Sequence, residues 1–192
     1  MTALLKTALM LCWLVLLAYW GWSALHAKPA ARNESRHKQL LAYWLPLAIA
    51  VFLLGPGRWF GHSWLREQFV PHSTLVFATA LLLAVAGTVV AIWARHQLGR
   101  NWSGNVQIKQ EHTLITNGPY RWVRHPIYSG LLLLFCGTAL MVGDWRGVIA
   151  VAIVFASFWF KLRQEERFLA QHFGAPYLDY ARRTKLLIPG LL

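Results

Sequence analysis

Charged residues are scarce in this sequence, and acidic residues are the scarcest of all. Only 14% of the 192 residues carry a charge, and seven Asp and Glu stand against 19 Lys and Arg. Soluble domains average about 25% charged residues. Together with an apolar fraction of 57%, this shortage argues against an ordinary soluble protein.

Cysteine is nearly absent as well, and its placement argues against a zinc site. Cys12 and Cys136 both lie inside apolar runs, far apart in the sequence. The sequence contains no Cys-x-x-Cys pair and no combined Cys and His spacing of a zinc site. We therefore predict no metal site and interpret both cysteines as packing residues.

The excess of positive charge does not indicate a nucleic-acid-binding protein. The net charge is +12, but the basic residues lie between apolar runs and do not follow one polar face. Cationic loops beside apolar segments are typical of membrane proteins. Eleven tryptophans fit the same class, because Trp concentrates at membrane–water interfaces. We expect an all-α integral membrane protein that contacts membrane lipids and binds no nucleic acid.

Five apolar segments are expected to cross the membrane as helices. They are residues 3–25, 40–54, 73–94, 127–142 and 148–160. About 20 apolar residues span a bilayer, so the short second segment must tilt, kink at Pro46 or thin the bilayer locally. The first segment has Lys6 before its apolar core, as a signal peptide would. It is long, however, and no A-x-A cleavage site follows, so we expect it to be retained.

The predicted spans divide the chain into residues 1–72, with two spans, and residues 73–192, with three. A tight turn at residues 143–147 makes the last two spans an antiparallel hairpin. We expect the last helix to continue to residue 173 and to end at Gly174. Pro176 then suits the first turn of a short surface helix that covers residues 177–183. Residues 106–116 are expected to be extended.

The distribution of basic residues indicates an orientation in the membrane. Fifteen of the 19 Lys and Arg lie in residues 26–39, 95–125 and 161–192, which fall on one side of five spans. The positive-inside rule then puts the N-terminus outside and the C-terminal region in the cytosol. With only four spans, these basic segments would be divided between the two sides.

Residues 117–130, NGPYRWVRHPIYSG, form a polar, turn-rich segment that leads directly into the fourth span. Pro126 biases His125 away from the helical region and begins the span, where free N–H groups attract an anion. Arg121 and Arg124 offer paired hydrogen bonds to a carboxylate or phosphate. The segment therefore predicts a binding site at the membrane boundary.

Two adjacent carboxylates, Glu165 and Glu166, follow the fifth span. The antiparallel hairpin is expected to bring them close to residues 117–130. Adjacent carboxylates at a membrane boundary are costly unless they are paired or functional, and these two offer acceptors to an ammonium group or a ribose diol. A simpler alternative stays open for each residue. Glu165 can pair with Lys161 one turn earlier, and arginines beside a span commonly anchor to lipid phosphates.

Three motifs occur in order along the C-terminal half of the chain. They are LGRNWSG at residues 98–104, GPYRWVRHPIYSG at residues 118–130 and EERFLAQHFGAPYLDYARRTKLLIPG at residues 165–190. As an ordered set, they resemble the isoprenylcysteine carboxyl methyltransferase family and its prokaryotic relatives. The related phospholipid methyltransferases share this general plan, and membrane sterol reductases have a similar RHPxYxG region.

The resemblance implies a methyltransferase of a prokaryotic inner membrane that uses S-adenosylmethionine. It makes residues 73–192 the methyltransferase core, with a cytosolic, helical C-terminal region that binds the cofactor. Carried over position by position, it implies cofactor-binding roles for Tyr120, His125, Pro126, Tyr128, Gly130, Glu165 and Glu166. It implies catalytic roles for Arg124 and Arg163, and a substrate or lid role for Tyr177, Tyr180 and Arg183.

The favoured reaction is direct in-line methyl transfer to the carboxylate of a lipophilic acceptor that is isoprenylcysteine-like, either a small molecule or a lipidated chain. A carboxylate needs no proton removed, so alignment and desolvation are the main requirements. Two enzymatic alternatives are a phospholipid amine or thiol methyltransferase of the same fold and an NADPH-dependent membrane reductase. A non-enzymatic scaffold or transporter is the third alternative.

Overall fold

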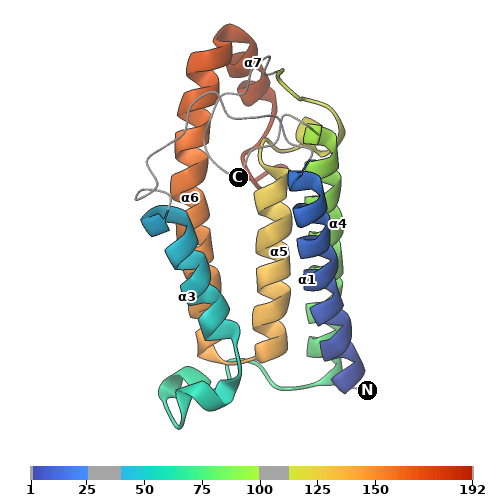
Figure 1. Ribbon diagram of the computed structural model, residues 1–192, viewed down its shortest axis with the longest axis vertical. Helices are drawn as coiled ribbons and strands as arrows, with labels where there is room; N and C mark the ends of the chain where they lie inside the picture. Colours follow the sequence, from blue (N-terminus) through green and yellow to red (C-terminus); the bar gives the residue numbers. More distant parts are fainter. Residues whose placement is uncertain (1, 26–39, 100–112, 192) are drawn as a thin grey trace.

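The computed structural model describes residues 2–25, 40–99 and 113–191, which are mostly helical and contain no strand (Figure 1). The helices are α1 (Thr2–Ala24), α3 (Leu45–Leu54), α4 (Thr74–Leu98), α5 (Pro126–Val142), α6 (Trp145–Phe173) and α7 (Ala175–Arg183). The first five run side by side along the long axis of the molecule, and α7 lies at the upper end (Figure 1). The predicted all-helical class is therefore confirmed.

All five apolar segments predicted as spans are helical. Three helices have the length and hydropathy to cross a membrane: Ala3–Ala24, Thr74–Leu98 and Trp145–Phe173. Two apolar helices are shorter, Leu41–Leu54 and Pro126–Val142. The sequence therefore located the apolar helices correctly, and the count of five crossings stays a prediction.

Helix α4 is longer than the sequence indicated. The apolar pattern predicts an end at Ala94, before a charged residue, but the helix continues to Leu98. Arg95 lies inside the helix and is only 2% exposed. Its guanidinium donates to the carbonyl oxygen of Gly99 at 2.8 Å and to that of Ser23 at 2.9 Å. These hydrogen bonds to the ends of α4 and α1 let a buried arginine remain within the helix.

The predicted break at the end of the long C-terminal helix is confirmed. Helix α6 runs without interruption to Phe173, and Gly174 follows with a positive φ of 61°. A positive φ is open to glycine at little steric cost. The next helix, α7, begins at Ala175, two residues before the predicted start, and Pro176 lies in its first turn.

The second apolar segment changes helix type along its length. A π-helical turn covers Leu40–Trp44, and an α-helix follows over Leu45–Leu54 with Pro46 in its first turn. Proline fits a first turn because its missing N–H would have no helical partner there. The predicted irregularity at Pro46 therefore takes the form of a junction between two helix types.

Glycines bring α4 and α5 into close contact. A Cβ on Gly130 would lie 2.6 Å from the carbonyl oxygen of Gly87 and 2.6 Å from the amide nitrogen of Ala91. Gly137 makes a similar approach to Ala80. Small residues at such positions let membrane helices pack backbone against backbone. Helix α1 packs on α4 and α3 packs on α6, so α1 and α3 lie on opposite sides of α5 (Figure 1).

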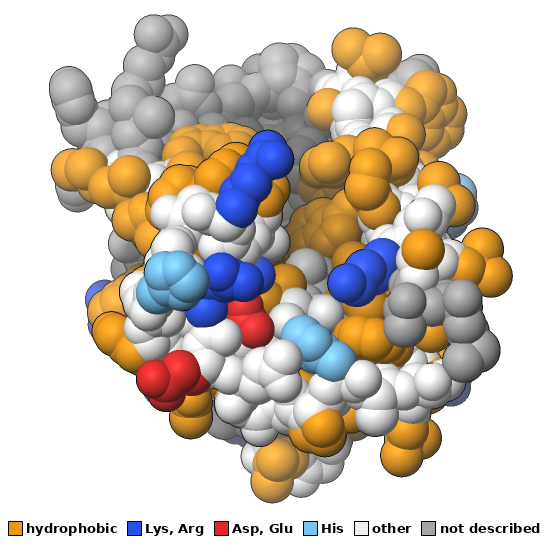
Figure 2. Space-filling model, turned by 90° about the horizontal axis from the view of Figure 1, so that it is seen from below, with side chains coloured by type: hydrophobic (Ala, Val, Ile, Leu, Met, Phe, Trp, Pro, Cys, Tyr) orange, Lys and Arg blue, Asp and Glu red, His pale blue; other side chains and the backbone are white. Residues whose placement is uncertain are grey.

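At the lower end of the bundle, a backbone hydrogen bond connects the loop before α4 with the start of α6, where a buried ion pair also lies. The amide of Trp145 donates to the carbonyl of Glu67, and buried Arg146 pairs with Asp144 at 3.0 Å. Figure 2 views the molecule from this end, where cationic side chains lie among apolar ones. The polar cluster that includes Glu165 and Glu166 lies at the opposite, upper end of the bundle.

Some predictions concern residues outside the described ranges. They include the loop at 26–39 and residues 100–104 of the LGRNWSG motif. Most of the segment at 106–116 also lies outside, and its described part, residues 113–116, has no regular structure.

Candidate functional site

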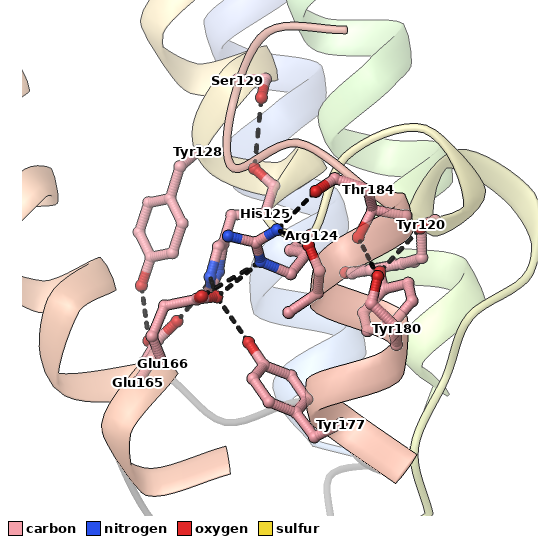
Figure 3. A network of polar contacts seen from close by, with 11 residues as sticks. Tyr120, Arg124, His125, Tyr128, Ser129, Glu165, Glu166, Tyr177, Tyr180 and Thr184 are labelled. Atoms are coloured by element: carbon pink, nitrogen blue, oxygen red, sulfur yellow. Dashed lines mark hydrogen bonds and ion pairs between the residues drawn. The ribbon is translucent and has the colours of Figure 1, made fainter. Parts of the chain in front are cut away.

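The site forms where the segment before α5 meets the upper part of α6 and α7 (Figure 3). A 3-10 turn over Gly118–Arg121 precedes His125, which adopts φ −126° and ψ 58°. Pro126 occupies the first turn of α5, as expected from its fixed φ and its effect on the preceding residue. The proline thus keeps His125 out of the helix and next to α6.

Glu166 accepts hydrogen bonds from three side chains in this site. The Nε of Arg124 donates to both carboxylate oxygens, at 3.1 and 3.0 Å. The Nε2 of His125 lies 2.7 Å from Oε1, and the hydroxyl of Tyr177 donates to the same oxygen. Glu166 therefore links the segment before α5, helix α6 and helix α7 (Figure 3).

Glu165 occupies a different environment from its neighbour. The hydroxyl of Tyr128 donates to its Oε1 at 2.7 Å, and the Nδ1 of His125 lies 3.4 Å from its Oε2. Glu165 lines the main cavity of the molecule, whereas Glu166 is not among the described residues that line it. The two carboxylates thus flank one imidazole, with Glu165 facing the cavity and Glu166 behind the ring.

The segment after α7 closes over the start of α5. Arg124 and His125 donate their backbone amides to the carbonyls of Lys185 and Leu186, at 2.8 and 3.1 Å. The Nη1 of Arg124 donates to the carbonyls of Ala181 and Thr184. Sequence reasoning missed this contact, and the only signal for it was the apolar pair at residues 186 and 187, which packs against Leu162.

Tyr177 and Tyr180 of α7 donate hydrogen bonds to other parts of the site. The hydroxyl of Tyr180 donates to the backbone carbonyl of Tyr120 at 2.7 Å, and the hydroxyl of Tyr120 reaches the carbonyl of Ala94 at 3.4 Å. Burial raises the pKa of Tyr180 to about 12. Burial and the hydrogen bond to Glu166 also raise the pKa of Tyr177. Both hydroxyls therefore stay protonated and act as donors at neutral pH.

The electrostatics of the site favour a protonated His125. Its side chain is buried, and burial by itself lowers the pKa of an imidazole. Hydrogen bonds from the ring to Glu165 and Glu166 outweigh burial, so the pKa of His125 is raised above its usual value. The positive charges of Arg124 and protonated His125 then balance the two carboxylates.

The main cavity joins a polar end to a long apolar end. Its volume is about 470 Å³, within the range typical of small-molecule sites. The polar end is lined by Tyr120, Arg124, His125, Tyr128, Glu165, Tyr177 and Tyr180, with Lys161 nearby. The apolar end is lined by Trp13, Leu16 and Leu17 of α1, Trp44, Leu47, Leu131, Phe135 and Phe158. The cavity thus extends from the polar cluster along α5, between α1 and α3.

The structure brings seven of the twelve predicted site residues to the wall of this cavity. Pro126 and Gly130 are buried in α5, where Gly130 contacts α4. Arg163 lies outside the main cavity, with its guanidinium 4.7 Å from the ring centre of Trp159. Arg183 and Arg163 line a second, polar hollow that they share with Arg124. The described residues contain no cluster of His, Cys, Asp and Glu suited to a metal ion.

The sequence is similar to those of known methyltransferases. The profile of the family described as phospholipid methyltransferase matches residues 75–176. The chain is 34% identical over 112 residues to protein-S-isoprenylcysteine O-methyltransferase B of Arabidopsis thaliana, 57% of each chain. It is 35% identical over 119 residues to protein-S-isoprenylcysteine O-methyltransferase of Mus musculus, 60% of this chain and 42% of the mouse protein. The match thus spans about half the length of these curated relatives, and it confirms the predicted resemblance.

Proposed function

The chain belongs to the phospholipid methyltransferase family, and on that premise we propose that it is an integral membrane methyltransferase that uses S-adenosylmethionine. The proposed acceptor is the carboxylate of a lipophilic, isoprenylcysteine-like molecule. One observation carries the proposal: a single cavity has Glu165, His125 and Arg124 at one end and an apolar wall at the other. Such a cavity suits a polar cofactor and a lipophilic acceptor that meet in the middle.

The residues at the polar end fit the cofactor. Glu165 presents a carboxylate to the cavity and offers an acceptor for an ammonium group. The rings of Tyr120, Tyr128 and Phe158 also line the cavity and suit a cation held over an aromatic face. When bound, S-adenosylmethionine supplies an electrophilic methyl group on its sulfonium. The residues that hold it in this proposal are Tyr120, His125, Tyr128 and Glu165, with Tyr177 and Tyr180 as the lid.

Arg124 is the residue proposed to orient the acceptor carboxylate. Its Nε and Nη1 are engaged by Glu166 and by the carbonyls of Ala181 and Thr184. Its Nη2 edge has no hydrogen-bond partner among the described residues and is the edge offered to the acceptor. A guanidinium held at two positions by other groups is pre-organised, so little entropy is lost when it binds an anion.

The arrangement favours a carboxylate acceptor over an amine. An amine acceptor must lose a proton to a base, but His125 is held between two carboxylates in its protonated form. Glu165 already accepts from Tyr128 and faces the charged ring. A carboxylate needs no base, and the site contributes alignment and exclusion of water.

The acceptor's lipophilic chain is assigned to the apolar end of the cavity. This end lies between α1 and α3, whose residues Trp13, Leu17 and Leu47 contribute to its wall. Both helices have many exposed apolar side chains, as expected for contact with lipid. A chain that enters sideways from the bilayer would reach the polar end without crossing water. In the proposed topology, five spans put the N-terminus outside and the site in the cytosol of a prokaryotic cell.

Binding and transfer assays on detergent-purified protein test the proposal. Calorimetry should show saturable binding of S-adenosylmethionine and none of NADPH. Label from S-adenosylmethionine should then appear on the carboxylate of N-acetyl-S-farnesylcysteine, but not on the matching carboxamide or on phosphatidylethanolamine. Transfer to phosphatidylethanolamine alone would contradict the carboxylate acceptor and indicate an amine acceptor. Binding of NADPH alone would contradict the methyltransferase and indicate a reductase.

A further inference from the structure

A second hollow shares Arg124 with the main cavity. Its volume is about 380 Å³, and its walls come from α6, the end of α7 and the residues that follow α7. Five of the residues that line it are cationic: Arg124, Arg163, Arg182, Arg183 and Lys185. No carboxylate is among the described residues that line it. We call this hollow the basic pocket.

The positive charge of the basic pocket is only partly balanced. Arg124 pairs with Glu166 at 3.0 Å, and Arg182 pairs with Asp179 at 3.2 Å. The second pair is largely exposed to solvent, with side-chain exposures of 78% and 61%, so its attraction is weak. Cations gathered in one hollow repel one another, and a bound anion relieves that repulsion. One arginine guanidinium can donate two parallel hydrogen bonds to a phosphate group, so phosphate is the anion that fits best.

An apolar track leads into the basic pocket along α6. Phe155, Trp159 and Arg163 follow one another at four-residue intervals, which places them on one face of the helix. The rings of Phe155 and Trp159 stack with centres 6.0 Å apart, and the Arg163 guanidinium lies 4.7 Å from the Trp159 ring centre. Phe155 is 41% exposed, and Leu186 and Leu191 add apolar surface to the pocket. A free phosphate has no apolar part that could contact this track, whereas the acyl chain of a lipid could lie along it.

We infer that the basic pocket binds the phosphodiester headgroup of an anionic phospholipid, whose acyl chain lies along Phe155 and Trp159. The headgroup bridges Arg163 on α6 and the cations at residues 182–185. It therefore holds the segment after α7 against α6. The inference is independent of the methyl-transfer reaction, because its evidence is the charge of this pocket and the aromatic face of α6 beside it.

Native mass spectrometry of the purified protein tests the inference. The probe is phosphatidylglycerol, compared with phosphatidylcholine, and the variant is Arg182→Gln with Lys185→Gln. We expect retained phosphatidylglycerol to fall by about tenfold in this variant, since each cation near an anionic lipid contributes substantially to binding. The matched control is Arg58→Gln with Arg66→Gln, which removes two exposed cations from the lower end of the bundle and should keep the lipid. Equal loss in both double variants, or no loss in either, would overturn the inference.

Two further measurements separate a lipid from a free phosphate. Amide exchange at residues 181–187 should be slower in nanodiscs that contain phosphatidylglycerol than in pure phosphatidylcholine, because the headgroup fixes this segment. Inorganic phosphate, with ionic strength matched by chloride, should not displace the retained lipid. Displacement by millimolar phosphate, or equal exchange in both kinds of nanodisc, would contradict a lipid site.

Discussion

The guanidinium of Arg124 and the carboxylate of Glu166 lie 42 positions apart in the chain and meet at 3.0 Å. The same guanidinium donates to the carbonyls of Ala181 and Thr184. One side chain thus fixes the positions of α6, α7 and the segment before α5 relative to one another. Substitutions at these two positions should therefore affect the geometry of the whole site.

Arg124→Lys should reduce kcat/KM by about 10- to 100-fold, although it keeps the positive charge. A lysine has one ammonium group and cannot contact Glu166 and both carbonyls at once, and small displacements of aligned groups have effects of this size. The measurement is methyl transfer at saturating cofactor. Arg121→Lys is the control, because Arg121 rests on the ring of Trp122 at 4.1 Å and should keep full activity. Full activity of Arg124→Lys would show that only the positive charge of Arg124, and not its hydrogen-bonding geometry, is needed for activity.

Glu165→Gln and Glu166→Gln should have different effects although the residues are adjacent. Glu165 faces the cavity, so its replacement should weaken S-adenosylmethionine binding by about tenfold and should lower Tm by less than the change at Glu166 does. Glu166 accepts hydrogen bonds from Arg124, His125 and Tyr177. Its replacement should lower Tm by roughly 5 °C, since hydrogen bonds to charged groups contribute more than neutral ones. Calorimetry and thermal unfolding check the pair, and identical profiles for the two variants would refute this division of roles.

Stability should decrease as the pH rises above the ordinary pKa of histidine. The pKa of His125 is raised in the folded protein by Glu165 and Glu166. A raised folded-state pKa stabilises the fold fully below the unfolded pKa of about 6.5, and the contribution is lost as pH rises through the folded pKa. Thermal unfolding in detergent at a series of pH values measures this. His125→Gln should remove the decrease, and an unchanged pH profile in that variant would assign the dependence to other groups.

Gly130→Ala should destabilise the protein by about 1–3 kcal/mol through overpacking between α4 and α5. The added Cβ would lie 2.6 Å from the backbone of Gly87 and of Ala91, which cannot move aside as a flexible side chain would. Gly21→Ala in α1 is the control, because its added Cβ meets no atom within 4 Å. Thermal unfolding of the two variants checks the prediction, and equal Tm values would show that the helices can separate without cost.

The sequence predicted the parts of this molecule that depend on local pattern. Apolar length located the helices, Gly174 marked the end of α6, and the tight turn at residues 143–147 brought Glu165 and Glu166 next to His125. It did not predict that Arg95 would lie inside α4, because the partners of its guanidinium include the carbonyl of Ser23, 72 positions away. The different environments of the two glutamates also depend on contacts between distant residues.

The role of Gly130 illustrates the same limit. The motif suggested a residue that lines the cofactor pocket, and that role stays a prediction. The structure shows a contact between α5 and α4 at this position, which only the packing of the two helices defines. Pattern alone cannot separate a glycine that admits a ligand from one that admits a neighbouring helix.

The backbone bonds from Arg124 and His125 to residues 185 and 186 have a consequence for biosynthesis. Residues 184–187 are synthesised after α5, α6 and α7. Until those residues emerge, the amides of Arg124 and His125 lack their partners, and Arg124 lacks the carbonyl of Thr184. The polar end of the cavity is therefore completed late, after its helices have been synthesised. A chain that ended before residue 184 would contain all of the described helices yet be unable to close its site.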